Sequence, residues 1–149
     1  QARVRSERIG FVFQSFHLVP RLTAAENIAL PMTLAGIAPA ERAKRVKQAL
    51  KDYGLTDRAT HRPNELSGGQ RQRVAIARAT IMQPAMILAD EPTGNLDSHT
   101  GERISDLLFE LNKERGTTLV LVTHDERLAH RCRRLIRLEA GRLIDSVEP

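Results

Sequence analysis

The chain of 149 residues has one cysteine, no tryptophan and no long apolar run. The single cysteine, Cys132, cannot form a disulfide within the chain, which fits a reducing cytosol. No stretch of about 18 consecutive apolar residues occurs, so no segment has the composition of a membrane-spanning helix. The remaining composition, with 41% hydrophobic and 28% charged residues, is typical of one globular domain with a substantial core.

Aromatic residues are also scarce, and this bears on the interpretation of the basic charge. The net charge is +5, and several arginines lie close together in the last part of the chain: Arg127, Arg131, Arg133, Arg134, Arg137 and Arg142. Such a cluster fits nucleic-acid binding by charge alone, but one tyrosine and four phenylalanines offer little surface for stacking on bases. We therefore favour a solvated basic surface, of a kind that suits anionic lipid, and predict no nucleic-acid partner.

A helix is predicted to begin within the sequence Leu-Ser-Gly-Gly-Gln at residues 66–70. Ser67 is a good N-cap, because its side-chain oxygen accepts a hydrogen bond from an amide of the first turn. Gly68 and Gly69 carry no side chain that keeps an anion away from the amides at the positive end of the helix dipole. This pattern fits a phosphate site, although an ordinary Ser-Gly-Gly helix start explains it equally well when taken alone.

An apolar strand that ends in two carboxylates follows this helix. Residues 86–90 have the sequence Met-Ile-Leu-Ala-Asp, and Glu91 and Pro92 come directly after them. A buried parallel strand of this kind delivers Asp90 and Glu91 to the carboxyl edge of a sheet, where open α/β sheets bind ligands. Asp90 is then placed to hold Mg²⁺, and Glu91 to accept a proton from an attacking water. Two adjacent acids at a strand end also occur facing solvent, so the pair alone decides little.

The order of the polar groups along the chain is more informative than any one of them. Gln14 ends a first apolar strand, Asp90 and Glu91 end the second, and His124 follows a third. Parallel strands bring their carboxyl ends to one edge of a sheet, so these groups are expected to meet there. Packing alone does not explain such a convergence.

Strands alternate with helices along the chain, which predicts a doubly wound, mostly parallel sheet. The expected strands are 9–13, 86–90, 118–123, 134–139 and 142–146, the last two joined by a glycine turn as an antiparallel edge. The expected long helices are 39–53, 70–82 and 98–114, with a short one at 125–130. Another helix opens with a Thr-x-x-Glu capping box at Thr23, and Pro31 and Gly36 are expected to interrupt it.

Together these motifs resemble those of the ATP-binding cassette (ABC) ATPases. The corresponding elements are Gln14 for the Q-loop, residues 66–70 for the signature, 86–91 for the Walker B strand, 95–97 for the D-loop and His124 for the switch histidine. Residues 11–16 and 90–97 are most similar to transporters of the lipoprotein-release and macrolide-efflux type. The resemblance implies a P-loop NTPase-like α/β fold, with a helical subdomain at about 15–80 and a RecA-like core at 1–14 and 81–149.

The resemblance also implies roles for individual residues around ATP and Mg²⁺. Glu91, His124 and Gln14 are the expected catalytic residues, and Asp90 and Gln14 are the expected Mg²⁺ ligands. Two cassettes are expected to face head to tail, so that the signature and D-loop of one complete the ATP site of the other. The residues implied in this contact are Ser67, Gly68, Gly69, Gln70 and Asp97. Without the other motifs, His124 is an ordinary histidine at a strand end.

One motif of that family has no counterpart among these residues. The phosphate loop Gly-x-x-x-x-Gly-Lys-Ser/Thr, whose amides and lysine cradle the β- and γ-phosphates, is absent, and no Gly-Lys dipeptide occurs. In the resembled family this loop precedes the Q-loop. We therefore expect the chain to be roughly the C-terminal two-thirds of such an ATPase, without its N-terminal part, and to be inactive alone because it binds ATP poorly.

The expected function is that of the ATP-hydrolysing subunit of a bacterial ABC transporter that powers export or extraction. Its expected partners are transmembrane permease subunits and a second ATPase subunit, on the cytoplasmic side of the inner membrane. Phe16, Leu18, Val19 and Leu22, just after the Q-loop, belong either to the core or to a groove for the permease. Two alternatives remain open, namely a soluble ABC ATPase of DNA repair or translation and a non-catalytic interaction fragment.

Overall fold

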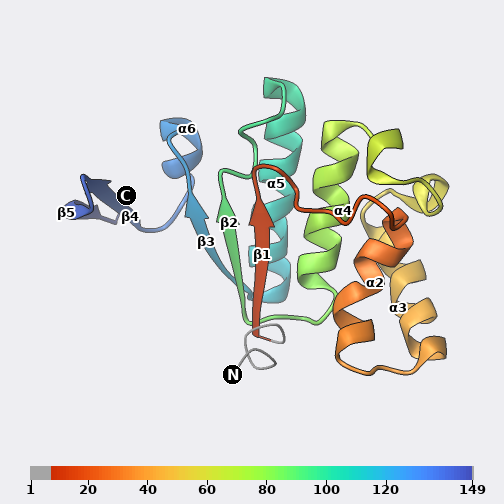
Figure 1. The fold of residues 1–149 in the computed structure, drawn as a ribbon. Helices are drawn as coiled ribbons and strands as arrows, with labels where there is room; N and C mark the ends of the chain where they lie inside the picture. The colour runs from red at the N-terminus through yellow and green to blue at the C-terminus, as the bar shows by residue number, and fades with distance from the viewer. Residues whose placement is uncertain (1–7, 149) are drawn as a thin grey trace.

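The fold is built on a parallel sheet of three short strands. The computed structural model describes residues 8–148. The strands lie in the order β1-β2-β3, each parallel to its neighbour (Figure 1). Their bounds are β1 (Ile9–Phe13), β2 (Met86–Asp90) and β3 (Thr118–Val122). These bounds agree with the expected strands to within one residue.

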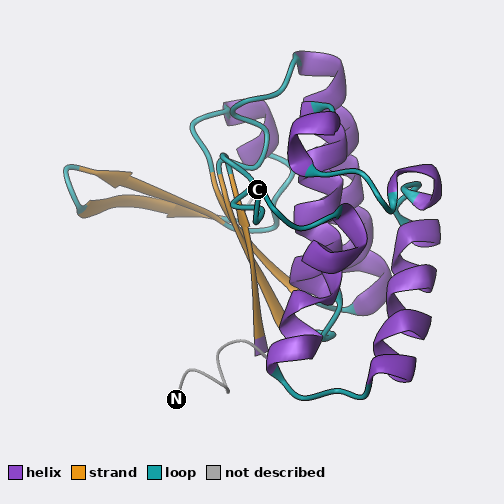
Figure 2. Ribbon diagram, turned by 45° about the vertical axis from the view of Figure 1, so that its right-hand side comes forward, coloured by secondary structure: helices purple, strands orange, loops and turns teal. Residues whose placement is uncertain are grey.

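Two long helices cover one face of this sheet (Figure 2): α4 (Gly68–Thr80) and α5 (Ser98–Arg115). Val12 of β1 is fully buried on this face, and Ile87 of β2 is 1% exposed. Helix α4 lies so close to β1 that a Cβ atom at Gly10 would overlap the carbonyl oxygen of Ala79. Close approach of a helix therefore requires glycine at this position of the strand.

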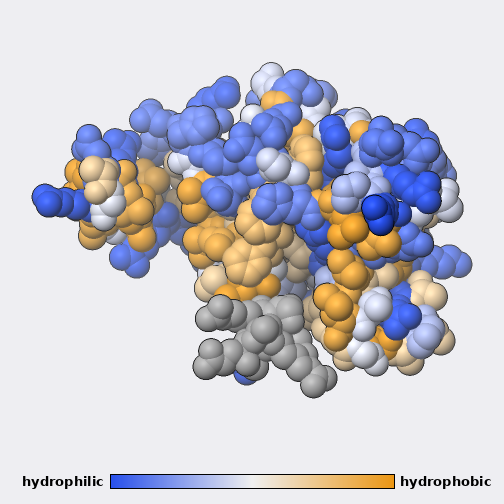
Figure 3. All heavy atoms as spheres, in the orientation of Figure 1, coloured by the Kyte–Doolittle hydropathy of each residue, from blue (hydrophilic) through white to orange (hydrophobic). Residues whose placement is uncertain are grey.

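The opposite face of the sheet carries apolar side chains that no helix of the described chain covers. Phe11, Val120 and Val122 point to this face and are 40%, 39% and 49% exposed. Figure 3 shows apolar residues gathered over the strands. The expectation of a doubly wound sheet is therefore wrong for residues 8–148, because α4 and α5 lie on the same side.

Two further helices pack beside α4, away from the sheet (Figure 1): α2 (Ala24–Leu34) and α3 (Pro39–Asp52). Helix α2 contacts both α3 and α4, and its Ile28 is fully buried in the common core. Helix α3 adds Val46, Ala49 and Leu50 to the same core. The apolar stripe of an amphipathic helix is thus buried against its neighbours, while its charged side faces solvent.

Helix α2 begins as predicted but continues further than predicted. The Thr23 side chain accepts a hydrogen bond from the Glu26 amide at 3.2 Å, and the Glu26 carboxylate accepts one from the Thr23 amide at 2.8 Å. Pro31 lies inside the helix, so the expectation that it interrupts the helix is wrong. Its carbonyl still accepts from the Ala35 amide at 3.0 Å, and full burial of Met32 holds the last turn on the core despite one lost hydrogen bond.

The C-terminal part of the chain forms a separate hairpin of two strands: β4 (Leu135–Glu139) and β5 (Arg142–Val147). Their antiparallel pairing agrees with the expectation. They form a sheet of their own, however, so the expectation that they make an edge of the main sheet is wrong. The chain leaves β3 through the short helix α6 (Glu126–Ala129), which carries the hairpin away from β3 (Figures 1 and 2). The two remaining short helices are η1 (Thr56–Arg58) and η2 (Pro63–Glu65), which connect α3 to α4.

Candidate active site at the carboxyl edge of the sheet

The three strands of the sheet end at the same level. Their last residues are partners across the two parallel ladders: Phe13, Asp90 and Val122. Gln14 follows β1 directly, Glu91 follows β2 directly, and His124 comes two residues after β3. The polar groups that were expected to meet at one edge of the sheet therefore all follow neighbouring strand ends at that edge.

Glu91 and His124 contact each other directly. Glu91 Oε1 accepts a hydrogen bond from the backbone amide of His124 at 3.0 Å and lies 2.7 Å from His124 Nδ1. An ionised carboxylate only accepts, so Nδ1 carries a proton and Nε2 is the ring nitrogen available to a ligand. The side chain of His124 is 86% exposed, whereas that of Glu91 is 22% exposed. His124 is therefore the member of the pair that a ligand reaches more easily.

The backbone of Glu91 turns sharply at the end of β2. Its φ of 47° is left-handed, which few residues other than glycine adopt. The Glu91 amide donates to the Val122 carbonyl at 2.8 Å, so the ladder between β2 and β3 extends one residue beyond Asp90 before the chain turns. Such a conformation lowers the stability of the folded chain by about 1–3 kcal/mol, and strain of this kind concentrates at functional sites.

Gln14 is joined to the loop after β2 by two hydrogen bonds with Asn95. Gln14 Nε2 donates to Asn95 Oδ1 at 3.2 Å, and Asn95 Nδ2 donates to the Gln14 carbonyl at 3.1 Å. Gly94 makes room for this contact, since a Cβ atom there would lie 2.5 Å from Gln14 Nε2. Because the amide nitrogen of Gln14 is engaged, its amide oxygen is the atom available to a metal ion.

Asp90 is exposed at the end of β2, where Phe13 of β1 is its ladder partner. A carboxylate at the end of β2 and an amide oxygen just after β1 suit Mg²⁺, which takes few protein ligands and keeps water and phosphate oxygens around it. Within residues 8–148, no group of three His, Cys, Asp or Glu side chains is placed to hold a metal ion. Asp90 and Gln14 offer oxygen ligands of the kind that Mg²⁺ takes when water completes its coordination.

Helix α4 begins at the predicted place with a complete capping box. Ser67 Oγ accepts from the Gln70 amide at 3.2 Å, and Gln70 Oε1 accepts from the Ser67 amide at 2.9 Å. The side chain of Gln70 therefore serves the start of its own helix. The first-turn amides lie at the positive end of the helix dipole, as a phosphate site needs.

Gly68 and Gly69 pack against the start of α5. A Cβ atom at Gly68 would lie 3.0 Å from Leu96 Cδ2, and one at Gly69 would lie 2.6 Å from Thr100 Cγ2. The two glycines therefore let the start of α4 lie close to these side chains, in addition to any role in the approach of an anion. This contact places the beginning of α4 beside the residues that follow Asn95.

Asp97, expected at the interface with a second cassette, is the N-cap of α5. Its carboxylate accepts a hydrogen bond from the Thr100 amide at 3.0 Å. That bond holds the pKa of Asp97 below its usual value. The carboxylate therefore stays ionised at neutral pH, at the positive end of a long helix.

Two residues of α4 that the sequence did not single out also reach this edge, namely Gln72 and Arg78. Gln72 is fully buried. The Arg78 guanidinium donates to the carbonyls of Phe16 and His17 at 3.1 and 2.8 Å, and both of these residues have positive φ. Burial lowers the pKa of Arg78, but from so high a value that the group stays charged. Polar residues inside an apolar-periodic helix were the only sequence signal for either residue.

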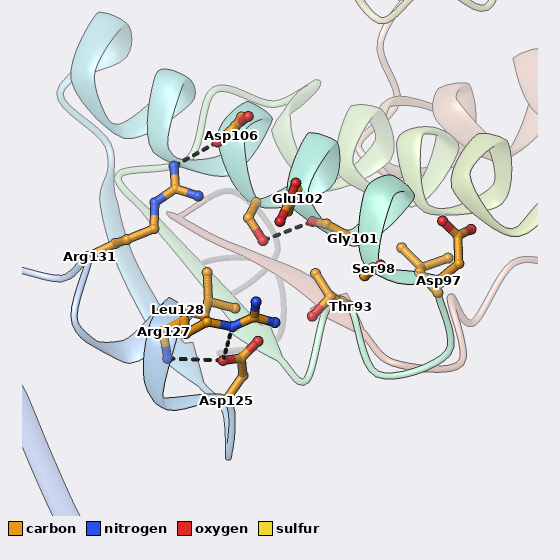
Figure 4. Close-up of a pocket in the computed structure, with 12 residues that line it drawn as sticks. Thr93, Asp97, Ser98, Gly101, Glu102, Asp106, Asp125, Arg127, Leu128 and Arg131 are labelled. Atoms are coloured by element: carbon orange, nitrogen blue, oxygen red, sulfur yellow. Dashed lines mark hydrogen bonds and ion pairs between the residues drawn. The ribbon is translucent and has the colours of Figure 1, made fainter.

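A pocket of about 450 Å³ lies between α5 and α6, beside this edge (Figure 4). Its lining does not include Gln14, Asp90, Glu91 or His124. Arg131 donates to Asp106 at 2.8 Å, and the Arg127 amide donates to the Asp125 carboxylate at 2.9 Å. Since these charged residues of the pocket bind one another, we assign no ligand to it.

Comparison with known proteins identifies the family. The ABC transporter family model matches residues 1–94, more than half of the chain. The chain belongs to the ABC transporter family. It is similar to the uncharacterized ABC transporter ATP-binding protein YbbA of Escherichia coli K12, with 53% identity over 143 residues that cover 96% of this chain and 63% of YbbA. It is also 50% identical to the lipoprotein-releasing system ATP-binding protein LolD of Legionella pneumophila (strain Lens), with the same two coverages.

A solved ABC cassette has the same fold. This structure, described as a dimeric post-hydrolysis state of the ATP-binding cassette MJ0796 bound to ADP and Pi, matches with a TM-score of 0.86 and 48% identity. The match covers 99% of this chain and 65% of that chain, so this chain spans less than two thirds of the length of these ABC proteins. The predicted ABC family and the predicted P-loop NTPase-like α/β fold class are confirmed. No helix within the described part of the chain is long and apolar enough to cross a membrane.

Proposed function

We propose that this chain belongs to the ATP-hydrolysing subunit of a bacterial ABC transporter that powers export or extraction. The observation that carries the proposal is the edge where Gln14, Asp90, Glu91 and His124 converge from three strands in register. Membership of the ABC transporter family and similarity to a lipoprotein-releasing system protein support the transporter class. The left-handed turn at Glu91 is a backbone strain of the kind that concentrates at functional sites.

In the proposed reaction, Glu91 is the general base. A water oxygen attacks the γ-phosphorus of ATP while the bond to the β–γ bridging oxygen breaks, giving ADP and inorganic phosphate. The proton of the water passes to the Glu91 carboxylate, which the His124 amide and ring hold in place. The His124 ring lies beside Glu91 through Nδ1, which leaves Nε2 as the ring nitrogen that faces a phosphate.

Asp90 and Gln14 are the residues that would hold Mg²⁺ in this site. When bound, the ion neutralises charge on the β- and γ-phosphate oxygens. Asp90 offers its carboxylate at the end of β2, directly or through a water. Gln14 offers its amide oxygen because Asn95 already holds its amide nitrogen.

The proposed partner at the nucleotide is a second cassette in a head-to-tail dimer. The positive end of α4 would contact the γ-phosphate of the ATP that the neighbouring cassette binds, through Ser67, Gly68 and Gly69. Gln70 and Asp97 would lie at the same interface. The description of the similar MJ0796 cassette as a dimer bound to ADP and Pi supports this arrangement. Transmembrane permease subunits are the further proposed partners, with the cassette on the cytoplasmic face of the inner membrane.

Replacement of Glu91 by glutamine tests the catalytic assignment. The experiment uses the chain extended upstream by the phosphate-loop segment of an ABC relative. Glu91→Gln keeps the length of the side chain but removes the base, so we expect kcat to fall by at least about 100-fold and ATP-bound dimers to accumulate. Glu110→Gln, at an exposed position of α5, is the matched control and should keep its turnover. Normal turnover in Glu91→Gln would remove Glu91 from the role of base.

Nucleotide titration separates an ATPase from a non-catalytic interaction fragment. The 149 residues contain no phosphate loop, so this chain alone is expected to bind a fluorescent ATP analogue weakly. The upstream-extended chain is expected to bind it tightly and in an Mg²⁺-dependent way. Absence of binding in both forms would favour the interaction fragment instead.

A further inference from the structure

The side chain of Gln72 joins the two loops that carry Gln14 and Glu91. Gln72 belongs to α4 and is fully buried. Its Nε2 donates to the carbonyl of Phe13 at 3.1 Å and to the carbonyl of Pro92 at 2.5 Å. Phe13 immediately precedes Gln14, and Pro92 immediately follows Glu91. One amide group therefore holds the ends of two neighbouring strands at the candidate active site.

The chemistry of this contact leaves little choice of side chain. Both partners are carbonyl oxygens, so position 72 must supply two N–H donors from one buried atom. Ionised glutamate only accepts, leucine and methionine offer no donor, and asparagine is one methylene shorter. The orientation of the amide is fixed for the same reason, because the oxygen of the amide cannot face two other oxygens.

The other half of the amide shows that position 72 is not optimised for packing alone. Gln72 Oε1 is buried and has no hydrogen-bond partner within residues 8–148. Burying an unsatisfied acceptor costs free energy that an apolar side chain of similar volume would not cost. A buried polar group kept under these conditions calls for an explanation, and the two carbonyls that it holds supply one.

The position of Gln72 on α4 connects the two halves of the site. Gln72 lies one helical turn after Gly68, so both residues share a face of the helix. The N-terminal turn of α4 carries Ser67 and Gly69, the proposed contacts to a neighbouring cassette's nucleotide. A small displacement of α4 is therefore passed to the ends of both loops through Gln72, which bonds a carbonyl in each of them.

We propose that Gln72 is a positioning residue that ties the signature helix to the loops of Gln14 and Glu91. It does not touch the reacting atoms but sets the relative placement of the two residues that do. The inference rests on the proposed function for the roles of Gln14 and Glu91. The hydrogen-bonded frame itself is a property of this chain and is testable without nucleotide.

Amide hydrogen exchange of the 149-residue chain, followed by NMR, tests this frame directly. The reporting amides are those of Phe16, Gly94 and Leu96, which donate to carbonyls within the two loops at 3.1, 3.0 and 3.1 Å. In Gln72→Leu we expect their exchange to accelerate at least tenfold, while the Tyr53 and Leu55 amides beyond α3 keep their rates. Unchanged rates in both loops, or a uniform acceleration over the whole chain, would overturn the proposal.

A matched control separates loss of position from loss of stability. Thr80 is a second buried polar residue of α4, but its hydroxyl bonds Tyr53 and its own helix. Thr80→Val should lower the midpoint of thermal unfolding without accelerating exchange at Phe16 or Gly94. If Gln72→Leu fails to fold, Gln72→Asn serves in its place, with accelerated exchange expected in at least one of the two loops. Wild-type exchange in both loops of Gln72→Asn would overturn the proposal.

Steady-state kinetics of the upstream-extended chain distinguish this inference from the proposed function. Since Gln72 positions residues that act on the water, Gln72→Leu should lower kcat at least tenfold while the KM for ATP changes less than twofold. Thr80→Val should keep kcat. Faster loop exchange with unchanged kcat in Gln72→Leu would overturn the role of Gln72 in the reaction. Normal activity in both Gln72→Leu and Glu91→Gln would overturn the proposed function.

Discussion

The two faces of the three-stranded sheet are both apolar, but only one of them is covered. On the face under α4 and α5, Val12 is fully buried and Ile87 is 1% exposed, whereas Phe11 and Val120 on the other face are 40% and 39% exposed. Apolar residues on both faces are typical of parallel sheets, which are usually buried on both sides. The comparison shows that an apolar pattern identifies the strand, whereas the elements packed on it decide which face stabilises the fold.

The largest effect is expected in the middle of the covered face. Ile87→Ala removes a side chain that is 1% exposed and leaves a cavity against the helices, so the free energy of unfolding should fall by about 3–4 kcal/mol. Urea unfolding followed by circular dichroism measures this loss. A loss below about 1 kcal/mol would contradict the dependence of stability on the helix-covered face.

A second variant tests how closely α4 approaches the sheet. Gly10→Ala places a methyl group against the Ala79 carbonyl oxygen, so we expect a loss of about 2–3 kcal/mol through overpacking. Gly116→Ala is the control, because its φ is 62° and nothing lies within 4 Å of a Cβ atom there. The control should lose only about 1 kcal/mol, from backbone strain. Equal losses in the two variants would show that crowding by α4 is unimportant.

Tyr53 tests the polar part of the core on the helical side. Burial raises the pKa of Tyr53, while its hydrogen bond to Thr80 at 2.7 Å opposes that rise. The unfolded chain therefore releases the tyrosine proton first, so stability falls as the pH rises above the ordinary tyrosine pKa of about 10. Tyr53→Phe should cost about 1 kcal/mol at pH 7 and lose this part of the alkaline decline. Identical unfolding curves against pH from 9 to 11 for both proteins would refute the assignment to Tyr53.

The smallest effect is expected on the uncovered face. Val120→Thr keeps the shape of a side chain that is 39% exposed, and its hydroxyl can be solvated. The free energy of unfolding should change by less than about 0.5 kcal/mol, measured by the same urea titration as Ile87→Ala. A loss comparable with that of Ile87→Ala would mean that the two faces contribute alike.

Local chemistry was sufficient to predict the strands and several helix starts. The run Met-Ile-Leu-Ala-Asp has the length and burial of β2, and the capping residues Thr23 and Ser67 begin α2 and α4 as expected. These features depend on neighbours within a few residues, so the sequence contains their cause. The order of Gln14, Glu91 and His124 likewise predicted their meeting at one edge, because parallel strands align their ends.

Features set by distant contacts could not be predicted in the same way. Pro31 stays inside α2 because Met32 is buried against other elements, and the hairpin leaves the main sheet because α6 diverts the chain. The role of Gln72 could not be predicted because it depends on which two carbonyls face α4. The packing of Gly69 against Thr100 was hidden for the same reason. Each of these requires knowledge of which elements are neighbours in space.

The left-handed turn at Glu91 separates two demands that any replacement must meet at that position. Glycine accommodates the turn easily and deletes the carboxylate, glutamine keeps the length of the side chain, and valine opposes the turn because it branches at Cβ. In a library of all substitutions at position 91, Glu91→Gly should therefore yield more folded protein than Glu91→Val. Both variants should lack ATP turnover. The side chains that the fold accepts at position 91 are therefore not the side chains that the reaction accepts.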